Sequence, residues 1–206
     1  MSTPKILIVT VTGQPRSGKD SLINLTVEKL RQMMPTQTTK IRRASSVGPL
    51  KNMLQDYIEE CLPRGTFNWE EPDGQLRSTL SVIKSQLDAC YQWTTRYALS
   101  IIEVATRPRK LIPNTERVIL FYQIREHANL GDLAGVCAAM DYEMEPIFIM
   151  RTDRPEVAMA TTDYVNEDDY PFTMKINSTP PEGKSLDEWW EILTNEITAK
   201  ILERFQ

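Results

Sequence analysis

The segment 13–20, Gly-Gln-Pro-Arg-Ser-Gly-Lys-Asp, fits the pattern G-x-x-x-x-G-K and limits the possible folds of this chain more than any other feature. An apolar, β-branched run at 6–11 leads into Gly13, and apolar residues at helical spacing follow Lys19. A strand, a glycine-rich loop and a helix are the context that a phosphate-binding loop requires. Glycines let several backbone N–H groups face one anion, and the helix N-terminus adds partial positive charge. The segment therefore predicts a phosphate-binding loop, with Lys19 as a point charge for the outer phosphates.

Strand-like and helix-like segments alternate along the rest of the chain, which predicts an α/β fold with a mainly parallel sheet and helices on both faces. Strands are expected at 5–11, 40–44, 117–124, 146–150 and 173–177. Helices are expected from the loop to residue 34, at 50–61, 76–105 and 130–140, and from 185 onward. The pattern at 76–105 fits either one long helix or two helices with an unmarked break.

Length and charge limit the number of domains and the classes of ligand that this chain is expected to have. The 206 residues suggest one domain, 1–206, and the net charge is −4. Residues 1–51 nevertheless hold nine Lys/Arg and two Asp/Glu, and a basic region around a phosphate loop favours an anionic small molecule. A nucleic-acid surface is the competing interpretation, which the acidic remainder weakens. No segment is typical of a signal peptide or a membrane span, so a soluble, cytoplasmic protein is expected.

The cysteines and the histidine exclude other kinds of site. Cys61, Cys90 and Cys137 lack metal-binding spacing, and we expect them to be small buried residues. His127 is the sole histidine, which excludes a site built from several histidines.

The motifs resemble those of phage-type deoxynucleoside monophosphate kinases, whose loop is G-x-x-[RK]-S-G-K-D. Val47-Gly48-Pro49-Leu50-Lys51 is similar to the A-G-P-[IL]-K segment of that family, and Ile176-Asn177 with Ser185-Leu186-Asp187-Glu188 is similar to its I-x-N-x-G-S-L-E-E-L ending. Met150-Arg151 and 162–167 resemble its lid region. Animal-type phosphomevalonate kinases have a similar loop, but the later segments fit them less well. Residues 63–115 match neither family.

The resemblance implies a P-loop kinase-like three-layer sandwich that uses ATP and Mg²⁺. The residues expected to bind ATP are Gly13, Arg16, Ser17, Gly18, Lys19, Asp20 and Ser21. The residues expected to cancel charge during phosphoryl transfer are Lys19, Arg16, Arg125 and Arg151. Acceptor binding is expected from Lys51, Arg125 and Arg154. Arg42 and Arg43 are weaker candidates, because adjacent strand residues face opposite sides and at most one enters the cleft.

The chain departs from this family at one functional position. The family has D-x-R at the end of a strand, and this chain has Gln123-Ile124-Arg125. The family's acid usually helps to hold Mg²⁺ or its waters. Here the metal is expected at Asp20 and Gln123, with Asp20 taking over part of that task.

The first functional hypothesis is ATP-dependent phosphoryl transfer to a (deoxy)nucleoside monophosphate, in nucleotide biosynthesis. The alternatives are a catalytically degenerate nucleotide-binding relative with a structural or regulatory role, which Gln123 favours, and a kinase for another small acceptor such as phosphomevalonate. Residues 63–115 are expected to form a helical acceptor-binding insertion, a dimer surface or both, and 152–172 a lid or a plain surface loop. The expected partners are nucleotides, with no nucleic acid or membrane and with a homodimer left open. The expected location is the cytoplasm, that of the host if a phage encodes the chain.

Overall fold

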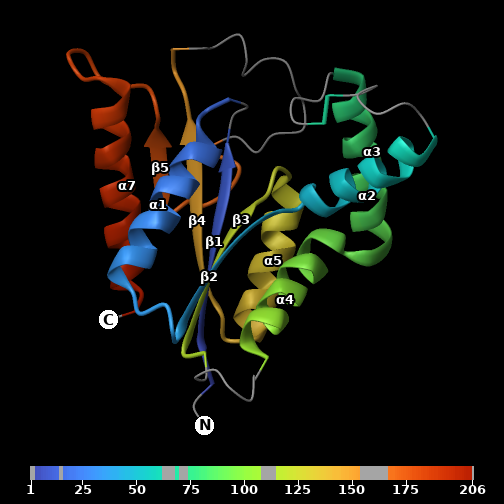
Figure 1. Cartoon of the computed structure of the whole chain (residues 1–206), viewed down its shortest axis with the longest axis horizontal. Coiled ribbons are helices and arrows are strands. Elements are labelled where there is room, and N and C mark those ends of the chain that lie inside the picture. Colours follow the sequence, from blue (N-terminus) through green and yellow to red (C-terminus); the bar gives the residue numbers. More distant parts are fainter. Residues whose placement is uncertain are drawn as a thin grey trace.

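The computed structural model describes residues 3–13, 16–61, 68–69, 74–107, 115–153 and 167–205. Within these residues, five parallel strands form one sheet in the order β2-β3-β1-β4-β5 (Figure 1). The strands are β1 (Lys5–Gly13), β2 (Thr39–Ser45), β3 (Arg117–Gln123), β4 (Glu143–Met150) and β5 (Met174–Asn177). The helices are α1 (Lys19–Met33), α2 (Gly48–Cys61), α3 (Gly74–Tyr91), α4 (Trp93–Thr106), α5 (His127–Ala139) and α7 (Leu186–Glu203).

Helices cover both faces of the sheet, as the apolar runs of its central strands require. In β1, Leu7, Val9 and Val11 pack with residues of α1 and α7, two helices that lie side by side in Figure 1. Their neighbours Ile6 and Ile8 face the opposite layer, formed by α4 and α5. Burial of each of these side chains contributes about 1.5–3 kcal/mol, so the central strand holds the two outer layers together.

Parallel pairing brings the carboxyl ends of the strands to one edge of the sheet. Gln123 of β3 lies opposite Val11 of β1 and Ser45 of β2. On the other side of β1, Gly13 pairs with Ile149 of β4. The loop that follows Gly13 therefore leaves the sheet beside the ends of its neighbouring strands, where ligands bind in open α/β sheets.

The helical pattern at 76–105 consists of two helices, α3 and α4, separated at Gln92. Gln92 has a left-handed backbone with φ of 51°, and no glycine or proline marks the break. Oδ1 of Asp88, near the end of α3, accepts the backbone N–H of Thr94 at 2.7 Å. A carboxylate at a helix N-terminus satisfies a donor that the helix cannot, so Asp88 stabilises the start of α4.

Two expectations about burial are wrong. Cys137 is buried, but Cys61 and Cys90 are exposed, because they lie at the end of α2 and on the outer side of α3. The helical spacing of Leu186 with Trp190, Leu193 and Ile197 predicts that all four point inward, but Leu186 is 37% exposed in the first turn of α7. Among the described residues, no helix has both the length and the apolar character needed to cross a membrane.

Candidate phosphate-binding site

The described part of the loop between β1 and α1, Gly13 and residues 16–18, has backbone angles that suit an anion-binding turn. Gly13 has φ of 128°, and a Cβ there would lie 1.9 Å from the carbonyl oxygen of Ile149, so only glycine fits. Gly18 has φ of 80° and begins α1, which has no side-chain cap. Arg16 also has a left-handed backbone, with φ of 54°. Left-handed residues in such a turn direct neighbouring N–H groups towards one side, and the helix N-terminus, which has no side-chain cap, adds donors there.

Lys19 lies at the mouth of this loop. Its Nζ donates to the carbonyl oxygen of Gly13 at 3.0 Å and to Oγ of the buried Ser17 at 3.3 Å. Burial and the positive charge of Arg125 lower the pKa of Lys19 to about 8, and Asp20 opposes the shift. Both effects disfavour the charged form of this side chain in the free protein, and a nearby phosphate would stabilise it.

Asp20, in the first turn of α1, contacts residues from two strands, β2 and β3. Its Oδ1 accepts Nε2 of Gln123 at 2.9 Å, and it also accepts a guanidinium N–H of Arg43 on β2. Arg43 in turn donates to Oδ1 of Asn24 at 2.5 Å, one turn along α1. The structure therefore brings both expected metal ligands together and places Arg43 beside them. Arg43 was only a weak candidate in the sequence, and this contact identifies it, rather than Arg42, as the one that reaches the loop.

The described metal-ligating side chains suit a magnesium ion only in combination with substrate. The described residues hold no cluster of three or more His, Cys, Asp or Glu. Asp20 supplies a single carboxylate, 69% exposed, and Gln123 gives it an amide N–H rather than a second charge. Mg²⁺ commonly binds through one or two carboxylates plus substrate phosphates, so this set fits a metal that arrives with a nucleotide.

The arginines expected at the site are placed in different ways. Arg125 follows β3 and is exposed, and its positive charge contributes to the lowered pKa of Lys19. Arg16 is also exposed, on the loop itself. Arg151, at the end of β4, donates through Nε and a terminal nitrogen to the two oxygens of Asp153, at 2.7 and 3.0 Å. Its charge is therefore already compensated by a carboxylate. Arg154 lies outside the described residues.

Two further expected residues lie on helices. Ser21 is half-buried in the first turn of α1. Lys51 is half-buried in the first turn of α2, where its backbone N–H bonds to the carbonyl of Val47. The start of α2 follows β2, so Lys51 lies on the side of the site away from β4.

Trp190 of α7 forms part of the wall of the loop, and no sequence motif indicated this. A Cβ on Gly18 would lie 3.2 Å from its ring, so the indole packs directly against the glycine. The contact leaves little room for a side chain at 18 and joins the loop to α7. Only the three-dimensional contact reveals this role, because the helical pattern of α7 merely predicts that Trp190 faces inward.

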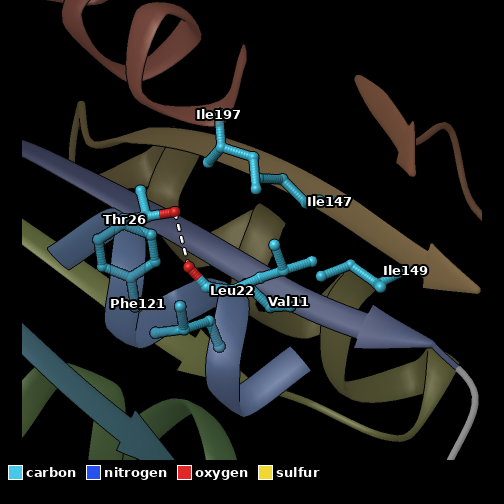
Figure 2. A pocket seen from close by; sticks show the side chains of 8 residues that line it. Val11, Leu22, Thr26, Phe121, Ile147, Ile149 and Ile197 are labelled. Carbon is cyan, nitrogen blue, oxygen red and sulfur yellow. Dashed lines mark hydrogen bonds between the residues drawn. The ribbon is translucent and has the colours of Figure 1, made fainter. Parts of the chain in front are cut away.

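A small cavity lies beneath α1, between that helix, the sheet and α7 (Figure 2). Its lining is Val11, Leu22, Ile23, Thr26, Phe121, Ile147, Ile149 and Ile197. The hydroxyl of Thr26, the one polar side chain in that lining, donates to the carbonyl of Leu22 at 2.7 Å. The cavity is therefore an imperfectly packed part of the core, and it offers no group that would bind a phosphate.

No protein-family model matches this chain, and no curated protein sequence matches it. Among solved structures, APS kinase from Mycobacterium tuberculosis in complex with AMPPNP and APS is similar, with a TM-score of 0.52 and 12% identity over 95% of this chain and 99% of that chain. Thymidylate kinase from Ehrlichia chaffeensis shares 14% identity over 97% of this chain and 100% of that chain, with a TM-score of 0.46.

At such identities the first likeness shows the fold alone. The chain has the P-loop kinase fold, an α/β sandwich with a parallel sheet between helices, as the sequence predicts. The motif resemblance to the phage-type family bears on the function and the substrate.

Proposed function

We propose that this chain is a kinase that transfers the terminal phosphoryl group of ATP to a (deoxy)nucleoside monophosphate, giving the diphosphate. One observation carries the proposal: the half-buried Lys19 ammonium lies in the first turn of α1, which has no side-chain cap, and has a pKa lowered to about 8. Such a site is electrostatically prepared for phosphate groups. The motif resemblance supports the nucleotide class, and the fold supports kinase chemistry.

In the proposed site, different residues bind the phosphates of ATP and the phosphate of the acceptor. Lys19 and the loop N–H groups would hold the donor phosphates, and Arg16 would add charge from the loop. Asp20, with Gln123 beside it, would hold Mg²⁺, which when bound neutralises phosphate charge. Arg125, Arg43 and Lys51 are the cations on the acceptor side. Arg151 and Arg154 remain proposed lid residues.

No residue is needed as a general base in this reaction. The second pKa of a phosphate monoester is about 6, so a monophosphate acceptor is largely dianionic at pH 7 and already a nucleophile. Phosphoryl transfer then depends on positioning and on cancelling negative charge. The site supplies cations and backbone donors for this, which agrees with an acceptor that is itself a phosphate.

Thermal shift and turnover assays test the proposal. The protein is incubated with ATP and Mg²⁺ and with each nucleoside or deoxynucleoside monophosphate, and with phosphomevalonate as a separate acceptor. A ligand at a hundredfold excess over its Kd stabilises the folded protein by about 2.7 kcal/mol. We expect ATP to raise the melting temperature and at least one monophosphate to be converted to the diphosphate.

The same assays separate the alternatives. Binding of ATP without turnover of any acceptor would favour the catalytically degenerate nucleotide-binding relative. The reason to consider that alternative is Gln123, which stands where the family has an acid. Turnover of phosphomevalonate alone would favour the other acceptor class. A protein that binds neither ATP nor any monophosphate would overturn the proposal. We further propose that nucleotides are its partners in the cytoplasm, with a homodimer as an outcome to be measured by sedimentation.

A further inference from the structure

The indole N–H of Trp190 is a buried donor that the fold does not use. Its Nε1 is shielded from solvent and donates to no acceptor among the described residues. A buried tryptophan usually finds a partner for this group, as the adjacent Trp189 does with the carbonyl oxygen of Asn177 at 3.0 Å. An apolar side chain would fill the same space without an unsatisfied donor, so stability alone gives little reason for an indole at position 190.

The far end of this indole is the part that meets the phosphate loop. A Cβ on Gly18 would lie 3.2 Å from Cζ2, 3.8 Å from Cη2 and 3.9 Å from Cε2 of Trp190. Cζ2 and Cη2 belong to the six-membered ring, and a phenylalanine ring at the same position would end short of them. The contact with the loop therefore depends on the length of the tryptophan side chain.

Gly18 needs a restraint that its own side of the loop does not supply. Its left-handed backbone, with φ of 80°, suits glycine, but glycine also has more alternative conformations than other residues. Its carbonyl oxygen accepts the N–H of Leu22 at 3.0 Å and so begins α1, which has no side-chain cap. The N–H groups of such a first turn have no partner within the helix. A ring packed on Gly18 limits the alternatives and leaves these donors available to a phosphate.

Helix α7 can support the loop because its first residues are fixed to the sheet. A capping box closes its N-terminus: N–H of Glu188 donates to Oγ of Ser185 at 3.2 Å, and N–H of Ser185 donates to Oε2 of Glu188 at 3.0 Å. The hydrogen bond from Trp189 to Asn177 then joins this turn to the end of β5. The ring of Trp190 therefore projects from a helix start that is held at both sides.

We infer that Trp190 is a positioning residue: its ring braces Gly18 and keeps the phosphate loop in its binding conformation before a phosphate arrives. The inference rests on the proposed function in one respect, that the loop binds phosphate groups. Trp190 acts through the backbone of Gly18 and supplies no group to the reaction. The unused N–H agrees with this role, because contact with the loop, and not a hydrogen bond, then sets the position of the indole.

Trp190→Ala, with Trp189→Ala as its matched control, tests the brace in the ligand-free protein. Both variants remove an indole from the same part of α7, but the ring against Gly18 is that of Trp190. We expect the ¹⁵N order parameter of Gly18 to fall from about 0.85, typical of a rigid backbone, towards about 0.6 in Trp190→Ala and to stay unchanged in Trp189→Ala. The melting temperature should fall in both variants, so a merely structural role would not separate them.

Calorimetric titration with inorganic tripolyphosphate in EDTA measures the consequence for binding. If only about a tenth of the folded Trp190→Ala protein holds the binding conformation, its Kd should rise about tenfold, whereas Trp189→Ala should stay within about twofold of the wild type. The titration is done well below the melting temperature of each variant, so that loss of folded protein does not contribute.

A second pair of substitutions tests the same contact if Trp190→Ala does not fold. Gly18→Ala places a methyl group against the indole and should weaken tripolyphosphate binding. In Trp190→Phe the shorter ring leaves room for that methyl group, so the same substitution should cost less affinity there. We expect a coupling of about threefold or more in Kd between the two positions, as for residues in contact. Effects that simply multiply would overturn the inference.

The outcomes distinguish the inference from the proposed function. If the wild type binds tripolyphosphate but converts no monophosphate, the kinase proposal fails and the readouts on Trp190 still apply. If the Kd of Trp190→Ala rises no more than that of Trp189→Ala, the inference falls alone, whatever the order parameter of Gly18. A wild-type protein that binds neither tripolyphosphate nor ATP overturns both.

Discussion

Nε2 of Gln123 donates a hydrogen bond to Oδ1 of Asp20 at 2.9 Å, which joins the end of β3 to the first turn of α1. The motifs of the resembling family have an acid at both of these positions, at the end of the loop and at the end of the strand. This chain keeps the acid on the helix and has an amide on the strand. The two positions are in contact, so one negative charge remains at this place in the site.

Gln123→Asp is expected to increase the dependence of the protein on Mg²⁺. The substitution replaces an amide donor with a second carboxylate beside Asp20. At a site this exposed, repulsion between the two charges costs about 1 kcal/mol. Without metal the melting temperature should fall, and Mg²⁺ should raise it more than in the wild type, together with a higher rate of phosphoryl transfer. Gln123→Asn, which is neutral and has the size of aspartate, is the control. Equal behaviour of the two variants with and without Mg²⁺ would place Gln123 outside the metal site.

Lys19→Met is expected to abolish phosphoryl transfer while the fold persists. Desolvation and the charge of Arg125 disfavour the ammonium, so its loss removes an unfavourable burial as well as a hydrogen bond to Gly13. The rate should fall by about 10²–10³, the effect typical of a charge-stabilising group in a dry site. Turnover and circular-dichroism melting of the same preparation measure both quantities. An unchanged rate in folded Lys19→Met would show that the loop does not hold the transferred phosphate.

The pKa of Lys19 predicts how nucleotide affinity varies with pH. Below about 8 the side chain is charged in the free protein, and above about 8 it loses its proton. Affinity for ATP should therefore decrease as pH rises from 8 to 9.5, because ligand binding must then take up a proton, whereas the phosphates no longer titrate in that range. Calorimetry in buffers of different ionisation enthalpy should detect this uptake. Lys19→Arg keeps its charge throughout the range, and a decrease of the same size in that variant would contradict the assignment to Lys19.

The phosphate loop was predictable because its signal is local. Gly13 and Gly18 occupy backbone conformations that other residues adopt poorly, and the strand before them and helix after them have clear periods. The fold class followed from the alternation of strands and helices. The short distance between Asp20 and Gln123 was suggested by the resemblance, since the two positions are far apart in the sequence.

Other features could not be predicted because they depend on contacts between elements. Alternation in β2 implied that one of Arg42 and Arg43 enters the site, but the choice depends on how the strand meets α1. The break at Gln92 depends on a carboxylate of the preceding helix, with no local glycine or proline. Lys84 of α3 is buried although lysine is among the residues least often fully buried, and only its contacts with two carboxylates explain this.

Arg43→Ala is expected to weaken the site, and Arg42→Ala is its matched control. Arg43 neutralises Asp20, so its removal leaves an unpaired carboxylate beside the donor phosphates. ATP affinity should fall about tenfold in EDTA, the lower end of the range for a lost bond between charged groups, and less in Mg²⁺, which would compensate Asp20. Arg42, its neighbour on the strand, faces the other way and should change affinity less than twofold. Equal losses in the two variants would show that general positive charge, and not the contact with Asp20, is what matters.

Arg125→Lys is expected to impair use of the acceptor more than binding of ATP. A guanidinium binds a phosphate through two parallel hydrogen bonds, which an ammonium cannot reproduce, so loss of one such bond should raise the acceptor KM or lower kcat about tenfold. A structural role would require a carboxylate partner, and the obvious ones are Glu126 and Asp132. Glu126 is bound to Lys84, and Asp132 forms no ion pair with Arg125 in the part of the chain that the structure describes.

The kinetics and the stability of Arg125→Lys decide between these roles. ATP affinity and the melting temperature should stay within error of the wild type, as they should in Arg107→Lys, a surface control whose arginine pairs with Glu103. Because Arg125 is exposed and forms no ion pair among the described residues, the substitution should disturb little packing and none of these ion pairs. A lower melting temperature with unchanged acceptor kinetics would make Arg125 a structural residue, and acceptor binding would then have to depend on Lys51 and Arg43.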